Sequence, residues 1–165
     1  MKITTLQVER VSVTSSRPFD SVVEALRASV GRLDLVEFSK ASKSTSTFSE
    51  LEKVIGRDVG KTGLMLFLEL DHGAVLRKET GLGQPRMMRF VIGNPLVMKE
   101  MVKHVPDAGT YAPVTVLVDE RADGVHLSYD TMASFLNSYG NAEALKVARE
   151  LDAKVETLLT AAAGR

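Results

Sequence analysis

The chain has 165 residues, of which 44% are hydrophobic and 25% charged, values typical of one globular domain with a sizeable core. Lysine plus arginine equals aspartate plus glutamate at 21 each, and only 5% of residues are aromatic, so nothing indicates a nucleic-acid partner. Cysteine is absent, which excludes disulfides, thiolate catalysis and cysteine-ligated zinc. The sequence has neither the apolar run of a secretion signal nor a window long enough to span a bilayer, so we expect a cytoplasmic protein without membrane contact.

The first third of the chain predicts a strand, a helix and an exposed loop. Alternating apolar residues predict the strand over residues 5–14. An apolar face that recurs over residues 19–30 predicts a helix that ends at Gly31. Residues 39–47 are rich in serine, threonine and lysine, so we expect them to form an exposed loop.

A short helix and a strand are predicted next. Ser49 and Glu52 have the spacing of a capping box, which predicts the start of the helix. The most hydrophobic run of the chain, residues 63–70, predicts a central strand that is partly covered on both faces. Residues 74–78 either continue this strand past a kink or form a short turn.

The second half of the chain contains two clear boundary signals. Residues 88–92 alternate as a strand, and Asn94 followed by Pro95 predicts that a helix begins immediately afterwards. The dipeptide Asp123-Gly124 predicts a tight hairpin between the strands on either side of it. These two strands are therefore expected to pair as antiparallel neighbours.

Two helices are predicted to close the chain. Asp130 is expected to cap a short one, and Asn141 a long one whose apolar residues recur at three- and four-residue steps. Hairpins rather than helical crossovers join several strands. We therefore predict one α+β domain over residues 1–165, with an antiparallel sheet of about five strands and helices packed on one face.

A binding site is predicted where strands end in polar residues. His72, Asn94 and Tyr129 each follow or end a predicted strand, and Asp130 comes next to Tyr129. If one rim of the sheet gathers these side chains beside an apolar face, they form a pocket for a small molecule or an anion. The free amides at the start of the helix after Asn94 also favour an anion.

Structural roles compete with this interpretation. Asn94 and Asp130 are both good helix caps, and His72 has the position of an ordinary turn histidine. A second functional hypothesis is a hydrolase or isomerase in which His72 is a general base oriented by Asp71 or Asp130. The sequence lacks a Gly-x-Ser-x-Gly nucleophile elbow and has no pair of histidines with metal-ligand spacing, so no cofactor or metal is predicted.

A third hypothesis is self-association. The chain has seven methionines, and Met87, Met88, Met98 and Met101 cluster around the predicted strand and helix of residues 88–102. Flexible methionine side chains suit adaptable contacts between subunits as well as cores. This pattern leaves both a homodimer surface and ordinary core packing open.

Several short motifs in combination resemble one known family. They are Asp71-His72-Gly73-Ala74, Arg89-Phe90-Val91-Ile92-Gly93-Asn94-Pro95, Tyr111-Ala112-Pro113 and Ser128-Tyr129-Asp130. The chain resembles the bacterial and archaeal family catalogued as domain of unknown function 302 over nearly its whole length. The resemblance implies a single α+β domain with an outline like that of TATA-binding protein, and a homodimer. It implies no reaction.

Overall fold

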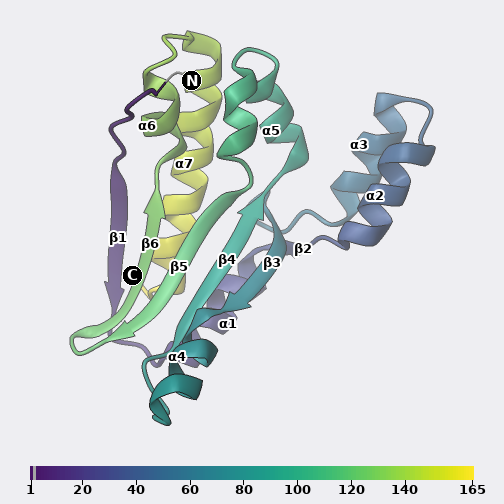
Figure 1. Cartoon of the computed structure of the whole chain (residues 1–165). Helices are drawn as coiled ribbons and strands as arrows, with labels where there is room; N and C mark the ends of the chain where they lie inside the picture. Colours follow the sequence, from purple (N-terminus) through teal and green to yellow (C-terminus); the bar gives the residue numbers. More distant parts are fainter. Residues whose placement is uncertain (2) are drawn as a thin grey trace.

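The computed structural model describes residue 1 and residues 3–165, and in this part of the chain six strands form one sheet (Figure 1). The strands are β1 (Arg10–Ser15), β2 (Gly31–Arg32), β3 (Met65–Asp71), β4 (Met87–Gly93), β5 (Val114–Arg121) and β6 (Gly124–Asp130). Their order across the sheet is β1-β6-β5-β4-β3-β2, and all neighbours are antiparallel except β2, which is parallel to β3. The protein is therefore α+β with a mixed sheet.

The helices form one layer, an arm and a short extension. The layer comprises α1 (Phe19–Ser29), α5 (Pro95–Val102), α6 (Met132–Asn137) and α7 (Ala142–Ala162), and α7 contacts each of the other three. The arm, α2 (Leu35–Ser44) and α3 (Phe48–Arg57), projects beside the sheet (Figure 1). The extension is α4 (His72–Thr80), and a short 3-10 helix, Pro106–Thr110, leads from α5 towards β5.

One face of the sheet packs on the helix layer and the other does not. Side chains that alternate along the strands, such as Phe90 and Ile92 of β4 and Val116 of β5, are fully buried against the helices. Burial of large apolar side chains of this kind is the main stabilising contribution to the fold. We call the opposite side the open face. Its residues include Arg10, Met87, Arg89, Val91, Thr115, Leu117, Ser128 and Asp130.

The strongest local predictions are confirmed. Asn94 caps α5, because its side-chain oxygen accepts a hydrogen bond from the backbone N–H of Leu96 at 2.9 Å, and Pro95 occupies the first turn. The turn before Gly124 joins β5 and β6 as a hairpin. Asn141 caps α7 through a 2.9 Å bond from the backbone N–H of Ala144.

Other local predictions are wrong in identifiable ways. Residues 35–44 form the helix α2 rather than ending in a loop, because Asp34 caps them. The capping box of α3 is Thr47 with Glu50, two residues before the predicted pair. Residues 72–80 form α4, which is capped by Asp71, instead of a strand or a turn.

The predicted sheet also needs correction. It has six strands rather than about five in the described residues, and β2 makes it mixed rather than antiparallel. The hydrophobic strand β3 lies next to the edge strand β2 and not at the centre, and Leu68 on it is 45% exposed. To that extent the fold departs from the TATA-binding-protein-like outline that the resemblance implies. Among the described helices, none has both the length and the apolar character that a membrane span requires.

Candidate functional site

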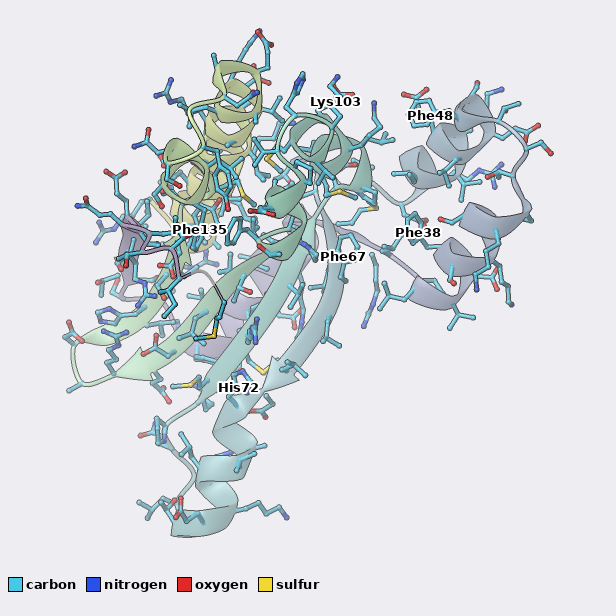
Figure 2. All side chains as sticks on the ribbon, turned by 45° about the horizontal axis from the view of Figure 1, so that its top comes forward. Phe38, Phe48, Phe67, His72, Lys103 and Phe135 are labelled. Carbon is cyan, nitrogen blue, oxygen red and sulfur yellow. The ribbon has the colours of Figure 1, made fainter. Side chains whose placement is uncertain are left out.

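A cavity of about 460 Å³ lies on the open face. Its floor is formed by β4, β5 and β6, and His72 borders it from the end of β3. Figure 2 shows His72 near the lower end of the sheet. We call this cavity the polar pocket. Its polar and aromatic lining consists of Arg10, His72, Arg89, Thr110, Tyr111, Thr115, Ser128, Asp130 and Phe135, and Tyr129 also borders it.

His72 borders the polar pocket without a catalytic partner. Its side chain is exposed at the first residue of α4. Asp71, the expected orienting carboxylate, instead accepts hydrogen bonds from the backbone N–H of Ala74 at 2.8 Å and from Arg77 at 2.7 Å. Among the described residues, no carboxylate is hydrogen-bonded to His72. In the described residues, the structure therefore shows no contact that would support His72 as a general base.

Tyr129 borders the pocket through its strand, while its hydroxyl points into the helix layer. The hydroxyl donates to the Asp152 carboxylate of α7 at 2.5 Å, and the ring is only 1% exposed. Burial, with the neighbouring carboxylate, raises the pKa of the Tyr129 phenol, so the hydroxyl stays protonated. Its role in the structure is therefore to support the wall of the pocket from behind.

Asp130 pairs across the sheet instead of capping α6. Its two carboxylate oxygens accept from the Nε and Nη2 atoms of Arg10 at 2.5 and 2.8 Å. The N-cap residue of α6 is Thr131, and the first amides of that helix are bound by Asp152. The Arg10–Asp130 pair thus forms one edge of the polar pocket with its charge internally balanced.

Asn94 lies apart from the other three predicted residues. β3 and β4 are antiparallel, so the end of β3 at Asp71 pairs with Met88, whereas the end of β4 at Gly93 pairs with Met65. The prediction that one rim gathers His72, Asn94 and Tyr129 is therefore wrong for Asn94. Its side-chain oxygen caps α5, and its amide donates to the Gly63 carbonyl at 3.0 Å.

Asn94 instead borders a second cavity of about 120 Å³, which we call the apolar pocket. Phe38 of the arm and Phe67 of β3 contribute to it, and Figure 2 shows both where the arm meets the sheet. Its lining residues are mostly hydrophobic: Phe38, Phe67, Gly93, Asn94, Pro95, Val97, Met98, Met101, Ala112, Pro113, Val114 and Leu151.

The sequence interpretation missed Arg89, the most suitable anion ligand in the polar pocket. Its Nη2 atom donates to the Thr115 hydroxyl at 3.1 Å, and its buried Nε atom has no hydrogen-bond partner. Within the described residues, Arg89 forms no ion pair with a carboxylate. Alternation along β4 places Arg89 on the face opposite Phe90, and this was the only available signal for its exposure to a pocket.

An aromatic pair lies at the end of the polar pocket near α6 and the 3-10 helix η1 (Pro106–Thr110). The rings of Tyr111 and Phe135 are stacked, with centroids 4.6 Å apart and an interplanar angle of 10°. The Tyr111 hydroxyl is 3.2 Å from that of Tyr139, which donates to Asp107 at 3.0 Å. These contacts hold a flat apolar surface beside the hydroxyl-lined floor.

Two of the four methionines considered for self-association belong to the core, whereas Met87 lies on the open face and Met98 lines the apolar pocket. Met101 is fully buried, and Met88 packs against the same cluster of core residues. The positions of Met88 and Met101 favour core packing over a subunit surface. The homodimer stays a prediction from the resemblance.

The contacts of Asp71 predict an acid-sensitive start of α4. The hydrogen bond from Arg77 lowers the pKa of the Asp71 carboxyl below its ordinary value of 3.8. The cap is therefore complete above about pH 4 and is lost as the pH falls through the lower folded value. In an NMR titration, the Ala74 amide signal should move below pH 3.8, and in Arg77→Met the midpoint should rise towards 3.8. Equal midpoints in the two proteins would refute this assignment.

Comparison with known proteins identifies the family. The family model described as Domain of unknown function DUF302 matches residues 38–162. The chain belongs to the DUF302 family. A crystal structure of an uncharacterized conserved DUF302 protein from Bacillus stearothermophilus is similar, with a TM-score of 0.61 and 12% identity over 91% of this chain and 94% of that one. This likeness shows that the two DUF302 proteins share a fold, and no curated protein matches the chain.

Proposed function

We propose that this DUF302 domain binds a small organic anion in the polar pocket, with Arg89 as the group that contacts the negative charge. The observation that carries the proposal is the state of Arg89. A guanidinium ion whose charge is balanced by no described carboxylate lies in a cavity, and one of its N–H groups is buried without an acceptor. Buried donors without partners are rare and costly, so Arg89 has an unmet polar interaction, and its uncompensated charge in a cavity favours an anionic ligand.

The surrounding charges support an anion rather than a cation. Arg10 is neutralised by Asp130, so Arg89 leaves the polar pocket with one uncompensated positive charge when His72 is neutral. The guanidinium group presents several donors in a plane, a geometry that matches a carboxylate. The hydroxyl groups of Thr115 and Ser128 on the same floor supply further hydrogen bonds.

The aromatic wall supports an organic ligand rather than an inorganic ion. Tyr111 and Phe135 present apolar surface at one end of a cavity whose other end is polar. Pockets that combine a few oriented polar groups with apolar surface are typical of small-molecule sites.

Replacing Arg89 by methionine tests the proposal. Loss of a charge-assisted hydrogen bond, which contributes about 1.5–3 kcal/mol, should weaken organic-anion binding roughly 10- to 100-fold. Isothermal titration with a panel of aliphatic and aromatic carboxylates measures the change. Lys146→Met is the matched control, because it removes one positive charge from an exposed position on α7 and should leave affinity unaltered.

The outcomes separate the proposal from its alternatives. If no carboxylate binds, or if Arg89→Met binds as well as the parent protein, the anion function is wrong. Equal losses in Arg89→Met and Lys146→Met would also contradict it, because they would show a general charge effect instead of a site.

A further inference from the structure

We infer that the ligand of this domain is an unbranched carboxylate whose head binds Arg89 and whose hydrocarbon tail runs along β4 into the apolar pocket. This inference rests on the proposed anion function and names the class of ligand. Three observations carry it: the chemistry of the apolar pocket, the closely packed glycine in its wall, and the row of residues along β4 between this pocket and Arg89.

The apolar pocket suits the end of a hydrocarbon chain. Phe38 and Phe67 line it from two elements, and the polar groups of Asn94 are already bonded to Leu96 and Gly63. A polar ligand group would therefore find few free partners there. Cavities lined by apolar side chains bind apolar groups in preference to water.

Gly93 lies in the wall of this pocket, where the neighbouring atoms leave little room for a side chain. A Cβ atom at position 93 would lie 3.1 Å from the Cβ atom of Pro113 and 3.7 Å from a ring carbon of Phe67. All three residues line the apolar pocket, so a methyl group at position 93 would have to shift Pro113 in its wall and thereby change the room available to a ligand.

The two pockets lie along one strand, with Val91 between them. Arg89, Val91 and Gly93 are alternate residues of β4, so they face the same side of the sheet. Arg89 lines the polar pocket and Gly93 the apolar pocket, and Val114 borders both. Four residues of strand span about 13 Å, a distance that an extended medium-length alkyl chain covers.

The residue beside this route is an exposed leucine. Leu68 pairs with Val91 in the register of β3 and β4, and it is 45% exposed. In this arrangement the carboxylate head contacts Arg89, and the tail passes Val91 and Leu68 before it reaches Phe67. An apolar tail over these side chains would remove their surface from water, which is favourable in proportion to the area covered.

A chain-length series tests the inference. Titration with butanoate, hexanoate, octanoate and decanoate, each below its micelle concentration, should show affinity rising up to about fourfold per added methylene once the tail contacts apolar surface. Gly93→Ala should weaken decanoate several-fold and leave butanoate unaltered. The control is Gly83→Ala, where no atom lies within 4 Å of the added methyl group, and it should bind both ligands like the parent protein.

The outcomes distinguish this inference from the function on which it rests. If butanoate and decanoate bind equally well through Arg89, or if Gly93→Ala affects them equally, the tail assignment is overturned and the anion site stands. If no carboxylate binds, both fail. Should Gly93→Ala not fold, Phe38→Ala replaces it, because removal of that ring should also weaken decanoate selectively. If Phe38→Ala binds decanoate as tightly as the parent protein does, the inference is overturned.

Discussion

Asp152→Ala is expected to lower the free energy of unfolding by about 3–5 kcal/mol, because the substitution removes a buried charge-assisted network. The Asp152 carboxylate is 6% exposed and accepts from three donors. They are the Tyr129 hydroxyl at 2.5 Å, the Met132 N–H at 2.8 Å and the Ala133 N–H at 2.9 Å. Alanine would leave a phenol and two amides at the start of α6 without this acceptor.

Urea unfolding at neutral pH measures this effect. Asp152→Asn should cost less, because one side-chain oxygen can still accept. Glu150→Ala is the matched control on the exposed side of the same helix, and it should change stability by less than about 0.5 kcal/mol. A loss below about 1 kcal/mol for Asp152→Ala would show that the network is not the anchor of α6.

Gly31→Ala is expected to have the second large effect and to lower the free energy of unfolding by about 3 kcal/mol or more. Two backbone segments meet at Gly31 and leave no room for a methyl group. A Cβ atom at position 31 would lie 1.7 Å from the Asp58 carbonyl oxygen. The same crossing leaves no room at Gly60, where a Cβ atom would lie 2.2 Å from the Gly31 nitrogen. Both segments bind the Leu64 carbonyl, at 2.8 Å from Gly31 and 3.1 Å from Gly60.

The arm begins after Gly31 and ends before Gly60, so the loss of stability should be concentrated in the arm. Hydrogen exchange should show lost protection at Leu33 and across α2 and α3 in Gly31→Ala. The matched control is Gly56→Ala within α3, where no atom lies within 4 Å of the added group. Alanine there should stabilise the protein by about 0.5–1 kcal/mol, since glycine is a poor helix residue. Similar effects of the two substitutions would contradict the account of the crossing.

The sequence predicted those parts of the fold that depend on neighbouring residues. Asn94 with Pro95 identified the start of α5, and Asp123 with Gly124 identified the β5–β6 hairpin, because cap and turn chemistry acts over a few residues. The sequence-based prediction failed at α2, where the capping signal of Asp34 was weaker than the loop-like composition of the residues that follow it. Asp34 was overlooked as the cap of α2, since the helix after it buries no residue completely and its sequence is rich in serine and lysine.

The predicted site was partly wrong because contacts between residues far apart in sequence decide where its side chains lie. Asp130 has the residue type and position of a helix cap, but Arg10 lies beside it in β1, 120 positions away in sequence, and a residue of α7 takes over the capping role. Asn94 was separated from His72 by the antiparallel order of β3 and β4, which no local pattern encodes. Arg89 was missed because alternation shows which face a residue occupies but not whether helices cover that face.

The open face explains why the sequence gives so little information about function. Its polar pocket gathers side chains from β1, β4, β5, β6 and the start of α4, and each contributes a common residue type without a diagnostic spacing. The feature with chemical meaning is an arginine with an unused donor beside hydroxyl groups, and it arises only when the sheet is assembled.

The most direct test of the central claim is a crystal structure of the protein soaked with decanoate. We expect the carboxylate within hydrogen-bond distance of the Arg89 guanidinium, with the tail directed past Val91 towards Gly93. A carboxylate bound away from Arg89, or an open face filled by a second copy of the chain in solution and in the crystal, would contradict the account.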